Sequence, residues 1–138
     1  MKDVLVKDIM SHPLIFVDSN ATIQSVAKIM IMKNIGGVLV SDGESYRGII
    51  TKKDIVRIVA EGKATNKLQA KEIMTTPLKT VNVSDTVLEA AKKLVFAGVR
   101  RIVVSKDGKP VGMVSDRDIV KVAPDIVELL IENIRMKG

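Results

Sequence analysis

The chain of 138 residues contains no cysteine and a single histidine. Without cysteine there is no disulfide, no thiolate zinc site and no iron–sulfur cluster, and His12 alone cannot form a histidine metal centre. Metal catalysis and chemistry that pairs histidine with cysteine or serine are nearly excluded. His12 lies in a Ser-His-Pro loop, and we assign it no role.

Aromatic residues are also scarce, since only Phe16, Tyr46 and Phe96 are present. A surface that binds single-stranded nucleic acid by stacking bases on aromatic rings is hard to assemble from three such residues. The composition therefore argues against a nucleic-acid site of this kind.

Long apolar runs are absent as well. The chain begins Met1-Lys2-Asp3 without an apolar signal segment, and its longest apolar runs fall far short of the roughly 20 residues that span a bilayer. We expect a soluble, cytoplasmic protein that does not associate with membranes.

The composition that remains is typical of a globular protein, with 46% apolar and 28% charged residues. The length suits one compact domain whose halves depend on each other. The net charge of +6 attracts phosphates, whether on nucleic acid, anionic lipid or a small nucleotide. Charge alone does not choose among these partners.

The sequence repeats itself with an offset of 64 residues. Without a gap, 15 of the 51 positions in 7–57 are identical to their counterparts in 71–121, including Gly48/Gly112 and Asp54/Asp118. The repeat predicts two copies of one structural unit, over 7–60 and 71–123, followed by a C-terminal helix over 124–138.

Each copy shows the same order of hydrophobic patterns. A short extended stretch is followed by apolar residues at helical spacing, then by two β-rich runs around an Asp-Gly turn, and then by a second helix that we expect to start near Asp54 or Asp118. The prediction is an α/β (α+β) fold in which two β-α-β-β-α units pack face to face, with 60–70 as a polar linker. In the C-terminal helix an apolar stripe closes the core or meets another subunit; it contains Ile126, Val127, Leu130, Ile131 and Ile134.

Two heptapeptides, GIITKKD (48–54) and GMVSDRD (112–118), stand at the expected strand-to-helix junctions. One interpretation is structural, because Thr51/Asp54 and Ser115/Asp118 have the spacing of a capping box. The other is functional. A helix N-terminus that faces a cleft binds anions, so the hydroxyl and a Lys or Arg of the motif would hold phosphate and the carboxylate would accept hydrogen bonds from ribose hydroxyls.

The double β-α-β-β-α repeat, the IM-[ST]-x-P-L opening of each copy and the paired G-h-h-[TS]-x-x-D motifs resemble the CBS domain pair, or Bateman module. The resemblance spans residues 7 to about 123. It implies two clefts between the copies that bind AMP, ADP, ATP or S-adenosylmethionine, with Asp54 and Asp118 on ribose and Thr51 and Ser115 on phosphate or ribose oxygens.

The resemblance also implies that each cleft takes residues from the first strand of the opposite copy, around adenine. These are Thr75, Thr76, Leu78 and Lys79 facing Asp54, and Ser11, Pro13, Leu14 and Ile15 facing Asp118. Lys53 and Arg117 inside the motifs complete the basic groups. Just before the second strand the family often carries a basic residue, which Arg100 and Arg101 supply in copy two, whereas copy one has Gly36 and Gly37.

The two copies also differ in charge, since Lys52-Lys53 in copy one corresponds to Asp116-Arg117 in copy two. We expect unequal sites, with ATP better tolerated beside Asp54 and AMP beside Asp118, because the Asp116 carboxylate would oppose phosphate.

The sequence therefore predicts a regulatory module that senses an adenosine nucleotide, needs no cofactor, contains no catalytic or metal site and passes ligand occupancy to an unknown effector protein. CBS pairs generally associate, so we expect a homodimer. The alternative is a basic dimeric protein that binds RNA or DNA. An enzyme is disfavoured because no nucleophile–base pair is found and Asp54 and Asp118 belong to separate clefts.

Overall fold

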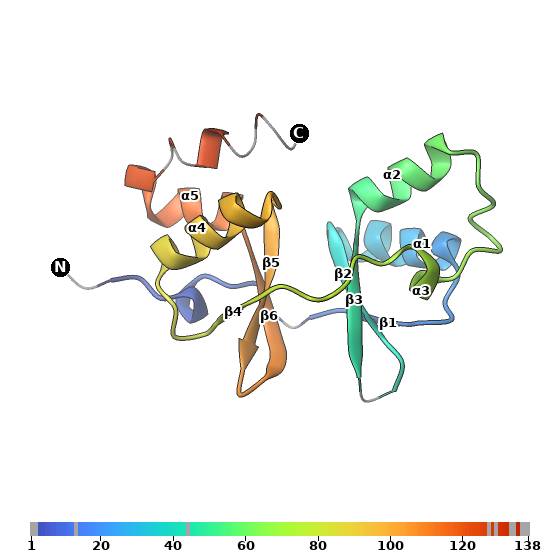
Figure 1. The fold of residues 1–138 in the computed structure, drawn as a ribbon, viewed down its shortest axis with the longest axis horizontal. Helices are drawn as coiled ribbons and strands as arrows, with labels where there is room; N and C mark the ends of the chain where they lie inside the picture. Colours follow the sequence, from blue (N-terminus) through green and yellow to red (C-terminus); the bar gives the residue numbers. More distant parts are fainter. Residues whose placement is uncertain are drawn as a thin grey trace. The chain divides into compact units, whose positions relative to one another are not determined.

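The computed structural model describes residues 3–12, 14–43, 45–126, 128, 130–132 and 135. The chain forms two compact units, shown in Figure 1. We call Ile15–Leu78 the first-copy unit, and Met1–Leu14 together with Lys79–Gly138 the second-copy unit. The units thus differ in their boundaries from the two sequence repeats.

The first-copy unit is a three-stranded sheet covered by helices. Its strand order is β1-β2-β3, with β1 parallel to β2 and β2 antiparallel to β3. In chain order the elements are β1 (Phe16–Asp18), α1 (Ile23–Lys33), β2 (Gly37–Ser41), β3 (Tyr46–Thr51), α2 (Lys52–Ala60) and the short α3 (Ala70–Ile73).

The second-copy unit repeats this topology with strand order β4-β5-β6. The α/β fold with two β-α-β-β-α units is therefore confirmed. The elements are the 3₁₀ helix η1 (Val6–Asp8), β4 (Thr80–Asn82), α4 (Val87–Ala97), β5 (Arg101–Lys106), β6 (Lys109–Ser115), α5 (Asp116–Val122) and the 3₁₀ helix η2 (Pro124–Ile126).

Each unit has its own apolar cluster between helices and sheet. In the first-copy unit, Ile23, Val26 and Met30 of α1 pack with Val38, Val40 and Ile50 of the sheet. The second-copy cluster joins the corresponding helix and strand residues Val87, Ala90, Ala91, Leu94, Ile102, Val104 and Val114. Helical spacing of apolar residues thus places one face of each helix on its sheet, as the sequence pattern predicts.

The same polar residues begin and end the first helix of each unit. Thr22 Oγ1 accepts a 3.2 Å hydrogen bond from Ser25 N–H, and Thr86 Oγ1 accepts one of 3.1 Å from Glu89 N–H. The C-cap residues that follow these helices, Asn34 after α1 and Gly98 after α4, both adopt the left-handed conformation. These are common start and stop signals for helices.

The second helices begin two residues earlier than expected. Helix α2 starts at Lys52 and α5 at Asp116, because Thr51 and Ser115 are the N-cap residues and the motif aspartates lie in the first turn. The short α3, which was not predicted from the sequence, begins at the last residue of the polar linker, the buried Ala70.

The opening segment of each repeat packs on the other repeat. Val6 N–H donates to Asp85 O in the second-copy unit, and Ala70 N–H donates to Ala21 O in the first-copy unit. This exchange explains why the compact units change over at residues 14/15 and 78/79.

The C-terminal segment contributes to the core of the second-copy unit. Leu130 is fully buried in the cluster of that unit, and Ile126 packs against it, whereas Ile131 is exposed. The predicted stripe therefore helps to close the core, although Val127 and Ile134 lie outside the described residues.

Candidate functional site

The first candidate site lies where β3 passes into α2. Thr51 donates twice to Asp54 Oδ2, from its N–H at 2.8 Å and from its hydroxyl at 3.1 Å. Asp54 Oδ1 lies 3.3 Å from Nη1 of Arg57, and the aspartate is buried. The motif carboxylate is thus held by its own helix start and by an exposed arginine one turn later.

The second candidate site, at the start of α5, has a different bonding pattern. Ser115 N–H donates to Asp118 Oδ2 at 2.9 Å, and Asp118 N–H donates to Ser115 Oγ at 3.2 Å, which is a reciprocal capping box. Within the described residues Asp118 Oδ1 accepts no hydrogen bond, although Arg101 interacts electrostatically with this carboxylate, and Asp118 is more exposed than Asp54. This carboxylate retains the capacity to accept further hydrogen bonds.

At Gly48, the motif glycine of the first site, the main chain of the segment around Thr75 packs directly against the strand. A Cβ at Gly48 would lie 2.6 Å from the Thr75 carbonyl oxygen. Beside it, Ile49 and Thr75 exchange two main-chain hydrogen bonds of 3.1 and 2.9 Å. The requirement for glycine therefore comes from the passing main chain, which carries Thr75 and the exposed Thr76 alongside the strand that leads to Thr51.

Gly112 has the same role in the second-copy unit. A Cβ there would lie 2.6 Å from Met10 Sδ and 3.0 Å from the Ser11 carbonyl oxygen. Ser11 and Met113 exchange two main-chain hydrogen bonds of 2.8 and 3.0 Å. Both units thus bring a Thr or Ser from an opening segment to the strand that carries the motif.

Arg100 and Arg101 occupy different environments. Arg100 Nε donates to Asp116 Oδ2 at 2.9 Å, and Asp116 is only 2% exposed. The interpretation of Asp116 as a carboxylate that opposes phosphate is therefore wrong, because Arg100 neutralises it. Arg101 lies opposite Ser115 in the sheet register, and burial lowers the pKa of its guanidinium.

Gly36 and Gly37 hold the equivalent places in the first-copy unit. Gly37 pairs with Thr51 in the sheet register, and Gly36 O accepts a 3.2 Å hydrogen bond from Lys52 N–H. The same main-chain bond joins Asp116 N–H to Arg100 O. The backbone is thus conserved between the units while the ion pair occurs in one of them.

The other predicted site residues are more scattered. Lys53 and Arg117 are exposed, and Leu14 and Leu78 are half-buried. Lys79 belongs to the second-copy unit and Ile15 to the first-copy unit, so neither shares a compact unit with the aspartate it was expected to face. Pro13 lies outside the described residues.

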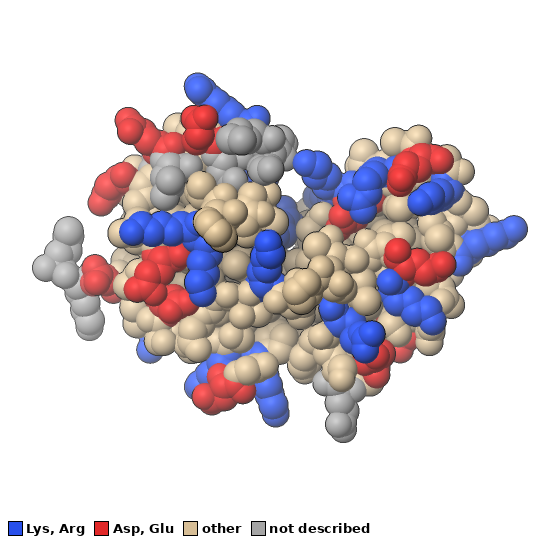
Figure 2. Space-filling view, in the orientation of Figure 1, with Lys and Arg blue, Asp and Glu red and all other residues tan. Residues whose placement is uncertain are grey.

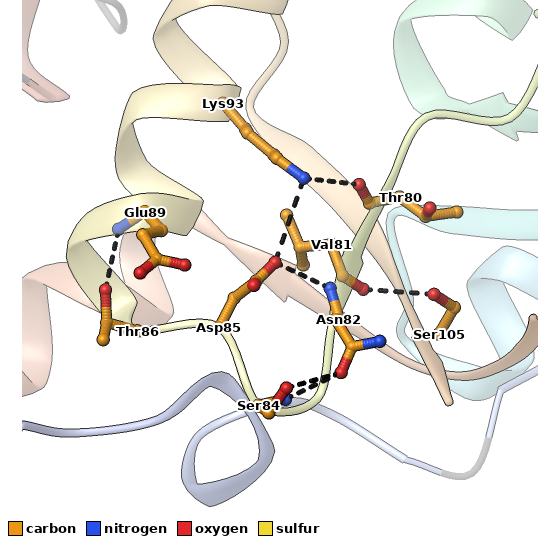
Figure 3. Close-up of polar contacts among 9 residues, drawn as sticks. All are labelled: Thr80, Val81, Asn82, Ser84, Asp85, Thr86, Glu89, Lys93 and Ser105. Atoms are coloured by element: carbon orange, nitrogen blue, oxygen red, sulfur yellow. Dashed lines mark hydrogen bonds and ion pairs between the residues drawn. The ribbon is translucent and has the colours of Figure 1, made fainter. Parts of the chain in front are cut away.

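A polar network fixes the strand that follows Lys79 (Figure 3). Lys93 Nζ donates to Thr80 O at 3.4 Å and lies 3.8 Å from Asp85 Oδ2, which also accepts a 2.8 Å hydrogen bond from Asn82 N–H. The first copy has the apolar Ile29 and Ala21 at the positions of Lys93 and Asp85. The two units therefore differ in ionic contacts here as well.

Sequence reasoning missed two charged contacts at the sites. Arg57 follows Asp54 by three residues, a spacing at which helix side chains meet, and this signal was present in the sequence. The pairing of Arg100 with Asp116 joins residues 16 positions apart, and only the sheet and helix geometry reveals it.

Two further searches gave negative results for the described residues. They contain no helix both long and apolar enough to cross a membrane. In the same part of the chain, no group of three or more His, Cys, Asp or Glu side chains is arranged to hold a metal ion.

Comparison with known proteins agrees with this architecture. The family model described as CBS domain matches residues 6–61 and again 70–125. The chain therefore belongs to the CBS domain family. An uncharacterised protein of Methanopyrus kandleri is 33% identical over 138 residues, which cover 98% of this chain and 70% of that protein.

Solved structures of this family are similar to the chain. The CBS domain pair of protein MJ0100, in complex with 5′-methylthioadenosine and S-adenosyl-L-methionine, is 32% identical with a TM-score of 0.81, covering 90% of this chain and 98% of that one. A hexameric CBS-CP12 protein from bloom-forming cyanobacteria is 27% identical with a TM-score of 0.82, covering 92% of this chain and 75% of that one.

Proposed function

We propose that the chain is a regulatory module that senses adenosine-containing nucleotides, among AMP, ADP, ATP and S-adenosylmethionine. The observation that carries the proposal is the juxtaposition found in both units. In each unit an aspartate that caps a helix lies just after the end of a strand. The opening segment of the other repeat, with Thr75 or Ser11, is hydrogen-bonded to that strand.

The groups at each site suit the parts of a nucleotide. Asp118 Oδ1 accepts from ribose hydroxyls, while Oδ2 stays on the helix cap. Asp54 does the same once Arg57 moves aside. The cost is modest because the arginine of this ion pair is exposed, although the aspartate is buried. The exposed Lys53 and Arg117 offer charge to phosphate.

The comparison with MJ0100 supports this class of ligand. Both molecules named in its complex carry adenosine, and the two chains align over nearly their whole length. A role for Lys79, Leu78, Ile15, Leu14 and Pro13 around adenine remains part of the proposal.

We further propose that the protein is not itself an enzyme, needs no cofactor and acts in the cytoplasm on an effector protein. Copies of the chain associate as a homodimer in this proposal, through apolar side chains that the second-copy unit leaves exposed, above all Phe96, Val122 and Ile131. The hexameric CBS-CP12 neighbour supports association in the family. Light scattering that finds a monomer at all concentrations contradicts the dimer.

The function is tested by mass spectrometry of small molecules released when the freshly purified protein is denatured, followed by calorimetric titration of the molecule found. We expect an adenosine compound that binds saturably. Binding of a small nucleotide should persist when salt is raised from about 50 to 500 mM. A protein that binds nucleic acid by counterion release would instead lose affinity steeply over this range. Recovery of nucleic acid with steep salt dependence contradicts the proposal.

A further inference from the structure

Strand β4 of the second-copy unit has side-chain anchors at both of its ends. At its beginning, Lys93 Nζ from α4 donates to Thr80 O at 3.4 Å. At its end, Asn82 N–H donates to Asp85 Oδ2 at 2.8 Å, and this carboxylate lies 3.8 Å from Lys93 Nζ. Figure 3 shows that Lys93 reaches both groups from one position on α4. A single lysine therefore ties a strand of only three residues to that helix.

The first-copy unit builds the corresponding strand, β1, without this lysine and aspartate. The repeat offset puts Ile29 at the position of Lys93 and Ala21 at that of Asp85, and neither residue can form an ionic contact. The turn after the strand is otherwise alike, since in both units a main-chain N–H donates to the side chain at the strand end. The same short strand therefore forms with apolar residues at these positions, so the fold alone does not require the ionic contact.

The segment that enters β4 also reaches the first candidate site. Thr75 exchanges two main-chain hydrogen bonds with Ile49 of β3, in the first-copy unit, and the chain then runs through 76–79 into β4 at Thr80. The change from one compact unit to the other falls within this stretch, at residues 78/79. Residues 76–79 form no helix or strand, and three of the four are exposed. We call residues 75–79 the crossing segment, whose two ends are held at Ile49 and at β4.

The Lys93 contact limits how much of this stretch is mobile. Without it, Thr80 stands at the unanchored end of a short strand, and the ends of elements fray most easily. A longer mobile stretch costs more ordering entropy when a ligand binds to Thr75 or Thr76. The Lys93 side chain is 54% exposed and that of Asp85 23%, and Figure 2 shows basic and acidic side chains on the surface over α4. Because contacts of this exposure are weak, the effect on binding is modest.

We propose that Lys93 is a positioning residue for the first nucleotide site, because it holds the start of β4 and so keeps the crossing segment ordered on β3. Lys93 itself contacts no nucleotide. The second site has no counterpart, since the opening segment that carries Ser11 leads into β1, where Ile29 takes the place of the lysine. The effect on ligand affinity rests on the proposed function, whereas the order of the crossing segment at Thr75 is measurable without a ligand.

The test compares Lys93→Ile, which copies Ile29, with Lys92→Ile as the matched control. Lys92 is the exposed neighbour on α4, so both variants remove the same charge. In an Asp118→Asn background, calorimetric titration of AMP reports on the first site. We expect Lys93→Ile to weaken this binding about two- to fivefold, the range for an exposed ionic contact, while Lys92→Ile and the conservative Lys93→Arg bind as the background protein does. In an Asp54→Asn background none of the three should change the affinity for AMP.

Hydrogen exchange followed by NMR tests the positioning without a ligand. Lys93→Ile should speed exchange of the Thr75 and Ile49 amides about two- to fivefold. The amides of Ser11 and Met113, which form the equivalent pair in the second-copy unit, should exchange as in the unaltered protein.

Unchanged exchange at Thr75 and Ile49 overturns the proposal, and so does equally faster exchange of both pairs, which would mean a general loss of stability. An equal loss of AMP affinity in Lys93→Ile and Lys92→Ile, or faster exchange without any loss of affinity at the first site, also overturns it. If the unaltered protein binds no AMP, the proposed function fails, and the exchange of Thr75 and Ile49 alone decides whether Lys93 positions the crossing segment.

Discussion

Arg100 Nε lies 2.9 Å from Oδ2 of Asp116, a carboxylate that is almost completely buried. The equivalent residues of the first copy, Gly36 and Lys52, keep the main-chain hydrogen bond without an ion pair. The two units thus have the same main-chain hydrogen bond at this position but different side chains around it.

Removal of Arg100 should destabilise the protein. Arg100→Ala removes the hydrogen-bonded cation of the buried Asp116 carboxylate. We expect the free energy of unfolding to fall by about 2–4 kcal/mol, less than for a fully buried pair because the arginine is partly exposed and Arg101 also interacts with Asp116. Urea denaturation measures this change. The double variant Arg100→Gly/Asp116→Lys, which copies Gly36 and Lys52, should recover most of the loss. A single variant as stable as the unaltered protein contradicts the account.

The two motif glycines should differ in their tolerance of alanine. At Gly48 the nearest atom to a new Cβ belongs to the Thr75 main chain, whereas at Gly112 it is the Sδ of the flexible Met10 side chain. We expect Gly48→Ala to cost about 2–3 kcal/mol of stability and Gly112→Ala about 1 kcal/mol, within the range for overpacking. Thermal unfolding of both variants gives the comparison, and the reverse order would be inconsistent with the structure.

Arg57 should compete with a nucleotide for Asp54. In an Asp118→Asn background, Arg57→Ala should raise the affinity for AMP about two- to fivefold, the range for loss of an ion pair whose arginine is exposed. Lys121 occupies the equivalent position in the second copy, where no ion pair with Asp118 is found among the described residues. Lys121→Ala in an Asp54→Asn background is therefore the control and should leave AMP affinity unchanged.

The nucleotide sites should also be unequal in their preference for phosphate. Lys52 and Lys53 are exposed at the start of α2, whereas the equivalent Asp116 is neutralised by Arg100. We expect ATP to lose more affinity in Asp54→Ala and AMP to lose more in Asp118→Ala, by separate calorimetric titrations. Equal losses of both ligands in both variants would mean that the sites are equivalent.

Much of this architecture could be predicted from the sequence, because the repeat and the spacing of apolar residues act locally. The helices that bury Ile23 and Val87 and the strands around the Asp-Gly turns follow from such patterns. The buried Asp116 could not be predicted, since its partner approaches through the tertiary fold. Nor could the exchange of opening segments, because the pattern of a segment does not say which copy it packs on.

Part of the candidate site could also be predicted, because it depends on residues that are close in the sequence. The capping geometry of Thr51/Asp54 and Ser115/Asp118 is local and was recognised from the spacing. The family resemblance predicts that Thr75 faces Asp54, and the main-chain contact of Thr75 with Ile49 was not predicted.

The central claim is that the motif aspartates bind ribose in addition to capping their helices, and Asp118→Asn separates the two roles. The asparagine carbonyl still accepts the hydrogen bond from Ser115 N–H, so the cap survives, but the free carboxylate oxygen is replaced by an amide nitrogen. Calorimetric titration of AMP should show a loss of about 1.5–3 kcal/mol at this site with a melting temperature close to that of the unaltered protein, and Asp54→Asn/Asp118→Asn should bind no AMP. Unchanged AMP affinity in the double variant would contradict the account and leave the aspartates as helix caps alone.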